Sequence, residues 1–244
     1  MGRPRVVLVH GSVVNGDATW GAQRALAEHF ELVIPNRRGF PPGGDVQHVD
    51  FEDEAEWLEP LVEPGTHLVG HSYGGVISLF AAARYADRLR SLTVVEPPAF
   101  GLARGNAAAD AFTAGGVELW ERGPRDPAAF VEQFLRFVGS AIPPGEFSDT
   151  LLQGARTLMV ERGPWEAEPP LDELAAAPWP KLVVSGAHSE AFDAVCDVLE
   201  ERLGAERAVL PGAGHSVPRL GEPFNVLLES FVYRAERGAE PLSF

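Results

Sequence analysis

The chain has 244 residues, of which 45% are hydrophobic, and this size and composition are typical of one globular domain with room for an inserted subdomain. Its 20 basic and 35 acidic residues give a formal net charge of −15, which disfavours binding to nucleic acid or to an anionic lipid surface. The lone cysteine, Cys196, cannot form a disulfide within the chain, so the sequence does not require an oxidising compartment.

The apolar stretches of the chain bear on where it works. The apolar run after Arg5 is broken at His10 and Gly11, too early for the hydrophobic segment of a secretion signal. No other stretch approaches the roughly 20 apolar residues that are needed to span a bilayer. From the charge and the apolar pattern together, we expect a cytoplasmic protein that binds neither nucleic acid nor membrane. The sequence makes no prediction of its oligomeric state.

Apolar runs alternate with helical patterns at both ends of the chain. The runs are continuously apolar, as expected of parallel strands that helices cover on both faces. The predicted strands cover residues 5–9, 31–34, 66–70, 91–95, 181–185 and 206–210. Apolar residues at three- and four-residue spacing predict helices at 18–28, 51–62, 74–85, 190–203 and 222–236. This order indicates an α/β fold with a six-stranded parallel sheet.

Residues 97–179 interrupt the alternation. They contain helical patterns such as DPAAFVEQFLRFVG, separated by breakers such as AIPPGEF, and no obvious strand. We expect a helical cap inserted into a core formed by residues 1–96 and 180–244. Most of its large apolar side chains should form the cap's own core and some should line an apolar pocket. These side chains are Phe112, Trp120, Phe130, Phe134, Phe137, Met159 and Trp165.

The strongest motif is LVGHSYGGVISLF, residues 68–80, in which Gly70-His71-Ser72-Tyr73-Gly74 joins an apolar strand to an apolar helix. G-x-S-x-G in this context is a nucleophile elbow, a tight turn that holds a serine in a strained backbone conformation. The two glycines provide the room that neighbouring backbone requires. Ser72 is therefore the candidate nucleophile.

A serine hydroxyl needs a base, and His215 is the best placed of the seven histidines. It lies in VLPGAGHSV, after the last predicted strand and before the last helix. The run Gly212-Ala213-Gly214 gives this loop the freedom to bring the ring over the strand ends.

Together LVHGS (8–12), NRRGF (36–40), GHSYGG (70–75) and GAGHS (212–216) resemble the α/β-hydrolase superfamily in order and spacing. The resemblance implies that fold, with the cap inserted after the strand that follows the elbow helix. Members of the family often begin with an antiparallel strand pair, for which the chain has no room, so we expect a shortened, all-parallel sheet. The resemblance also implies that the backbone N–H groups of Ser12 and Tyr73 form an oxyanion hole.

The acid of the expected triad is not in its common place. The usual G-x-x-D after the penultimate strand is here Gly186-Ala187-His188-Ser189, with serine in place of aspartate. Glu96, at the end of the strand after the elbow helix, is the preferred substitute, because some branches of the superfamily carry their acid there. Glu190, Asp193 or a dyad without an acid are the alternatives.

The residues together indicate a serine hydrolase that cleaves a carboxylic ester, lactone or thioester of a small apolar substrate through an acyl-enzyme. No cofactor or metal motif is visible, and none is needed. Two other functions stay open at this stage. One is carbon–carbon bond hydrolysis or lyase chemistry on the same fold, and the other is non-catalytic ligand binding.

Overall fold

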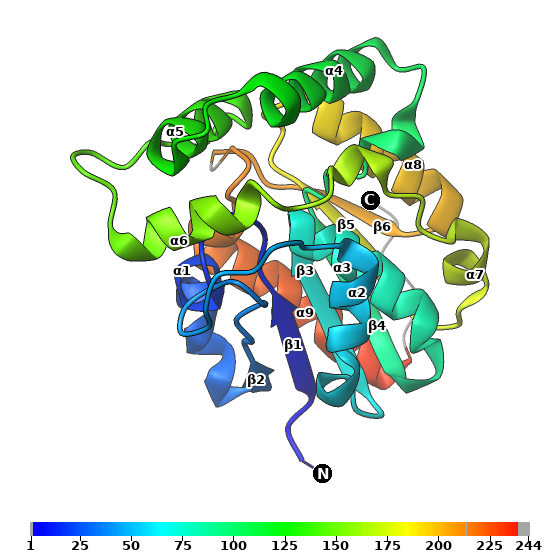
Figure 1. Ribbon diagram of the computed structural model, residues 1–244. Helices are drawn as coiled ribbons and strands as arrows, with labels where there is room; N and C mark the ends of the chain where they lie inside the picture. The colour runs from blue at the N-terminus through cyan, green and yellow to red at the C-terminus, as the bar shows by residue number, and fades with distance from the viewer. Residues whose placement is uncertain (1, 213, 239–244) are drawn as a thin grey trace.

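The computed structural model describes residues 2–212 and 214–238. Within them, one parallel sheet has the strand order β2-β1-β3-β4-β5-β6 (Figure 1). The strands are β1 (Arg5–Val9), β2 (Glu31–Val33), β3 (Thr66–His71), β4 (Leu89–Val95), β5 (Lys181–Ser185) and β6 (Glu206–Val209). The six-stranded, all-parallel sheet expected from the sequence is confirmed, and each strand begins and ends within two residues of its predicted bounds.

The order of the strands reverses between β1 and β3. The chain first moves from β1 to β2 on one side and then returns to pair β3 with the other side of β1, where Val6 aligns with His67 and Val9 with Gly70. In open parallel sheets, the loops that leave the carboxyl ends of such a strand pair diverge and open a crevice. This topology places the loops after β1 and β3 beside each other.

Helices cover both faces of the sheet. One face carries α2 (Phe51–Trp57), α3 (Tyr73–Arg84) and α8 (Glu190–Leu203), and the other carries α1 (Gly16–Trp20) and α9 (Glu222–Arg237). The buried residues of α9, Phe224, Leu228, Phe231 and Val232, recur at three- and four-residue spacing and pack on the sheet. The helices predicted at 74–85, 190–203 and 222–236 are confirmed within one residue.

Two predicted helices are shorter than expected. The pattern at 18–28 forms α1 followed by a 3₁₀ helix, Gly21–Glu28, which begins at a glycine of low helix propensity. The helix expected at 51–62 ends at Trp57 and continues as the 3₁₀ turn Glu59–Leu61. Pro60 lacks an N–H group and its ring would clash with the carbonyl four residues earlier, so an α-helix cannot continue through it.

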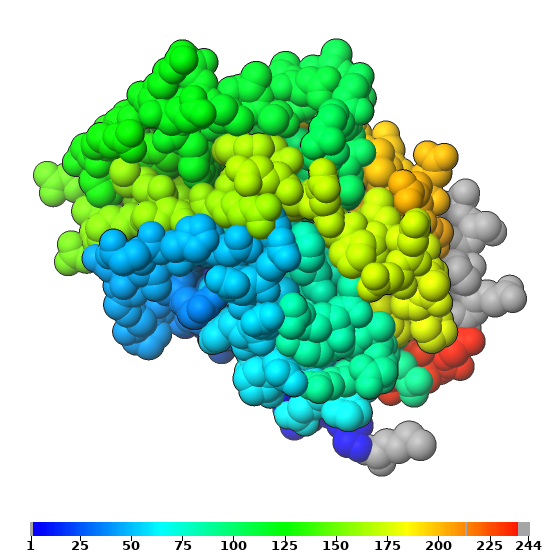
Figure 2. All heavy atoms as spheres, turned by 45° about the vertical axis from the view of Figure 1, so that its right-hand side comes forward, coloured from blue at the N-terminus to red at the C-terminus, as the bar shows by residue number. Residues whose placement is uncertain are grey.

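The segment between β4 and β5 contains α4 (Ala107–Arg122), α5 (Pro127–Phe137), α6 (Asp149–Leu158) and α7 (Leu171–Ala176). Asn106, Asp126 and Ser148 accept hydrogen bonds from the first amides of α4, α5 and α6, which fixes where these three helices begin. In Figure 1 these three helices lie over the carboxyl edge of the sheet, and in Figure 2 the green segment that contains them forms the top of the molecule. The short α7 instead packs on α3 and α8, so the chain returns to the core before β5.

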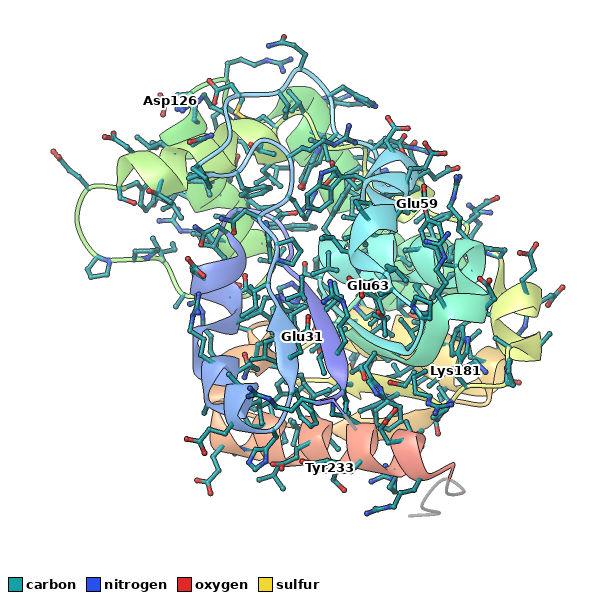
Figure 3. The ribbon with its side chains drawn as sticks, turned by 90° about the horizontal axis from the view of Figure 1, so that it is seen from below. Glu31, Glu59, Glu63, Asp126, Lys181 and Tyr233 are labelled. Carbon is teal, nitrogen blue, oxygen red and sulfur yellow. The ribbon has the colours of Figure 1, made fainter. Side chains whose placement is uncertain are left out.

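The opposite end of the molecule is seen in Figure 3, where Glu31 and Lys181 mark the beginnings of β2 and β5. Across residues 2–212 and 214–238, the helices are all too short or too polar to cross a membrane.

Candidate active site

Ser72 stands between β3 and α3 with φ 55° and ψ −128°, a conformation that side-chain-bearing residues rarely adopt. The neighbouring glycines explain why the turn needs small residues. A Cβ on Gly70 would lie 2.3 Å from the carbonyl oxygen of Gly74, and a Cβ on Gly74 would lie 2.4 Å from those of Val9 and His10. The sharp turn predicted from G-x-S-x-G is present in the structure.

The loop after β6 brings His215 to the serine. Its Nε2 lies 2.9 Å from Ser72 Oγ, and the side chain is almost wholly buried. The ring of His71 donates a hydrogen bond of 2.8 Å to the carbonyl oxygen of His215, which holds the loop in place. A Cβ on Gly186 would come within 2.2 Å of the Gly214 carbonyl oxygen, so the loop lies directly against the end of β5. Ala213, part of the glycine-rich run noted above, lies outside the described residues.

Glu96 follows the last residue of β4 and is fully buried. Its Oε2 lies 3.3 Å from His215 Nδ1, and its Oε1 accepts a hydrogen bond from the backbone N–H of Gly186. The structure thus brings Ser72, His215 and Glu96 into one hydrogen-bonded line. The two alternative acids lie elsewhere: Glu190 is exposed at the start of α8, and Asp193 pairs with Arg207 at 3.2 Å.

Burial shifts the pKa values of Glu96 and His215 in opposite directions. It raises the pKa of Glu96 to about 7, because removing a carboxylate from water disfavours its charged form, while the Gly186 N–H and His188 partly oppose the shift. Burial lowers the pKa of His215 to about 3, and the neighbouring His188 adds to the lowering. The imidazole of His215 is therefore neutral at physiological pH, as a general base must be.

His188 was not singled out by the sequence. Its Nδ1 lies 3.4 Å from the same Glu96 oxygen that faces His215. Glu96, His188 and His215 offer three ligand atoms within 4.8 Å of one another, a geometry that could also hold a metal ion. The sequence contains a signal for it, since His188 stands in Gly186-Ala187-His188-Ser189, the stretch where an acid is usual.

The loop after β1 carries Ser12 past the elbow. A Cβ on Gly11 would lie 2.7 Å from the Cβ of Ser72, so this backbone touches the serine. Ser12, Ser72 and Tyr73 line one pocket, and Tyr73 is the first residue of α3, where backbone N–H groups have no partner within the helix. These positions suit both expected donors of an oxyanion hole.

A buried ionic network supports the Ser12 loop, and sequence reasoning missed it. Arg37, fully buried, donates to the Gly11 carbonyl oxygen at 2.9 Å and pairs with Glu161 at 2.9 Å and Glu54 at 3.3 Å. Glu161 in turn accepts a hydrogen bond from the Ser12 hydroxyl. Arg37 belongs to the NRRGF motif that contributed to the resemblance, but its partner lies 124 residues away and nothing local indicates it.

Residues 160–162 connect the segment after β4 to the core. The Val49 N–H donates to the Val160 carbonyl oxygen at 3.0 Å, and the Arg162 N–H donates to that of Val49 at 2.8 Å. The indole N–H of Trp120, on α4, donates to the Glu161 carbonyl oxygen at 2.9 Å. Glu161 therefore joins α4 to the Ser12 loop.

Among the described residues, four that are not glycine have positive φ, and each of the four follows a strand at this edge. They are Val13 (73°), Ser72 (55°), Glu96 (51°) and Ala187 (50°). Each follows a different strand, β1, β3, β4 or β5. The backbone is thus strained where the candidate site is assembled.

Two pockets flank Ser72. The aromatic pocket extends under α4 and α5. Five of the seven large apolar side chains considered from the sequence line it: Phe112, Trp120, Phe134, Phe137 and Trp165. The outer pocket shares Ser72 and His215 with the aromatic pocket and is also lined by Ser140, Ser216 and Arg219.

Comparison with known proteins identifies the family. Residues 6–227 match the model of the alpha/beta hydrolase family. The pimeloyl-acyl-carrier-protein methyl ester esterase of Aeromonas hydrophila is 33% identical over 101 residues, and the match spans 40% of this chain but only 39% of that esterase. The 2-(acetamidomethylene)succinate hydrolase of Mesorhizobium japonicum is 25% identical over 236 residues, which are 88% of this chain and 82% of the relative.

A solved structure gives the same result for the fold. A thermophilic esterase from Thermogutta terrifontis aligns with a TM-score of 0.64 at 21% identity, over 96% of this chain and 91% of that one. The sheet, the elbow and the family match agree with the resemblance seen in the sequence. The chain is a member of the alpha/beta hydrolase family.

Proposed function

We propose that the protein is a serine hydrolase that cleaves a carboxylic ester, lactone or thioester of a small, largely apolar substrate. The observation that carries the proposal is the line of contacts from Ser72 Oγ to His215 Nε2, 2.9 Å, and from His215 Nδ1 to Glu96 Oε2, 3.3 Å. Relatives named as an esterase and as a hydrolase support it.

In this mechanism Ser72 Oγ attacks the substrate carbonyl carbon while His215 Nε2 takes the serine proton. Ionised Glu96 accepts a hydrogen bond from His215 Nδ1 and stabilises the imidazolium that forms. The N–H groups of Ser12 and Tyr73 stabilise the oxyanion, with a contribution of a few kcal/mol from each donor. His215 then returns the proton to the leaving group, and water hydrolyses the acyl-enzyme.

The aromatic pocket supports an apolar group on the substrate. It places five rings of the segment 97–179 beside Ser72, and we propose that this segment acts as a cap that selects substrate size. Glu161 is the charged exception on the pocket wall, and its carboxylate is already engaged by Arg37 and Ser12.

The test combines a fluorophosphonate probe with a series of 4-nitrophenyl esters of increasing acyl length, together with lactones and thioesters. We expect the probe to label Ser72 in the folded protein, and a Ser72→Ala variant to lose both labelling and turnover. Folded protein that the probe does not label, and that hydrolyses none of these substrates, would refute the proposal and favour non-catalytic ligand binding.

A further inference from the structure

Arg219 has an unusual position for an arginine of this chain. It lines the outer pocket together with Ser72 and His215, and its side chain is exposed. Most arginines of this acidic protein pair with a carboxylate, but Arg219 forms no ion pair with any described residue. An arginine that shares a pocket with the candidate nucleophile, and that has no acidic partner among the described residues of a chain of net charge −15, needs an explanation.

The backbone that carries Arg219 is firmly held. Arg219 lies four residues after His215, in the 3₁₀ turn Val217–Leu220, and its N–H donates to the Ser216 carbonyl oxygen at 2.9 Å. The fully buried side chain of Gln23 donates to the Pro218 carbonyl oxygen at 2.9 Å. These contacts fix the Arg219 backbone relative to His215, so the side chain that carries the guanidinium extends from a well-anchored backbone.

The charges around the outer pocket are one-sided. The described residues that line the outer pocket include no aspartate or glutamate, and Arg219 is the one arginine or lysine among them. Ser140 and Ser216 also line the pocket, and a serine hydroxyl can donate a hydrogen bond to oxygen. Among the described residues, the wall of the aromatic pocket has no arginine or lysine.

We propose that the outer pocket is a subsite for a carboxylate on the substrate, with the Arg219 guanidinium as its ionic partner. This inference rests on the proposed ester hydrolysis and names the substrate class as an ester that carries a carboxylate away from the scissile bond. A single guanidinium balances a single negative charge and can bind a carboxylate through two parallel N–H bonds. A phosphate dianion would bring a second charge into an acidic protein without a second cation to meet it.

The test uses two matched pairs of esters, because the carboxylate can lie on either side of the ester bond. The first pair is mono-4-nitrophenyl adipate and 4-nitrophenyl hexanoate, and the second is 4-carboxyphenyl butyrate and phenyl butyrate. For each pair, the ratio of kcat/KM for the anionic ester to kcat/KM for the neutral ester is measured in the wild type, Arg219→Gln and Arg219→Lys. Arg125→Gln is the control, since it removes the same charge from an exposed position away from the outer pocket.

We expect Arg219→Gln to lower this ratio about 10-fold in at least one pair, the lower end of the range for a hydrogen bond to a charged group at an exposed position. Arg219→Lys should keep part of the preference, and Arg125→Gln should keep all of it. Ratios that change less than about 2-fold in both pairs would overturn the inference while leaving the proposed function intact. Failure of the proposed function has a separate signature, which is the absence of Ser72 labelling and of turnover with all four esters.

Discussion

Replacing Glu96 by glutamine should separate catalysis from folding. The amide nearly matches the carboxylate in size and can still accept the Gly186 N–H, so the fold is kept. The glutamine side chain has only one acceptor oxygen, so it cannot accept hydrogen bonds from both the Gly186 N–H and the His215 Nδ1–H. It also carries no charge to stabilise the His215 imidazolium. Loss of the acid in a serine triad lowers kcat about 10⁴-fold, and we expect a loss of about 10³- to 10⁴-fold here.

The same substitution should make the protein more stable at alkaline pH. The pKa of Glu96 is raised from 4.5 to about 7 by burial, so the folded state holds its proton more tightly than the unfolded state does. The free energy of unfolding therefore falls as pH rises from the unfolded pKa to the folded one. With 1.36 kcal/mol per pKa unit, the difference amounts to about 3 kcal/mol above pH 7. Glutamine does not ionise and avoids this loss.

The assay is chemical denaturation at pH 5 and pH 8, alongside kcat/KM on a 4-nitrophenyl ester. Glu96→Gln should be more stable than the wild type at pH 8, with a smaller difference at pH 5, and nearly inactive at both. Glu190→Gln is the matched control, because Glu190 is an exposed glutamate and should affect neither quantity strongly. A Glu96→Gln variant near wild-type turnover, with a crippled Glu190→Gln, would refute the assignment of the acid.

Three further predictions follow from the same edge of the sheet. The wild-type kcat/KM should rise with pH and level off above about pH 7, since the Glu96 pKa is raised to about 7 and the ionised form is required; half-maximal activity below about pH 5 would contradict this. Gly74→Ala should lower the free energy of unfolding by at least about 1–3 kcal/mol, because its Cβ would lie 2.4 Å from two carbonyl oxygens. Gly44→Ala, with no atom near its Cβ, is the control in thermal melts. Glu161→Gln should lower kcat about 10-fold with a smaller change in KM, since it loosens the Ser12 loop; an effect on KM alone would exclude a role in the oxyanion hole.

The features that could be predicted from the sequence are those that a short stretch of neighbouring residues determines. The strands could be predicted from short, continuously apolar runs. The elbow could be predicted from Gly70 and Gly74, because a Cβ on either glycine would lie within 2.4 Å of a backbone carbonyl oxygen. Glu96 was the preferred acid because it ends the strand after the elbow helix, where some branches of the superfamily carry their acid, and the structure places it 3.3 Å from His215 Nδ1.

The contacts that sequence reasoning missed join residues far apart in the chain. Arg37 and Glu161 each look like ordinary surface charges, and only the folded chain buries them together. His188 was not predicted for a different reason. The usual motif of this stretch has its functional acid at the position of Ser189, and it gives no role to the residue before it. Which rings of the segment 97–179 face Ser72 depends on how its helices pack on the core, and helical periodicity alone does not specify that packing.

The positive φ angles at the ends of β1, β3, β4 and β5 have a consequence for heat inactivation. A left-handed backbone conformation costs about 1–2 kcal/mol for each residue with a side chain, so four of them together are comparable to the whole net stability of a typical domain. The buried sheet and its helices must supply that free energy to keep the edge in place. On heating, the strand ends can relax before the sheet melts, so the protein should lose its activity at a lower temperature than its tertiary structure.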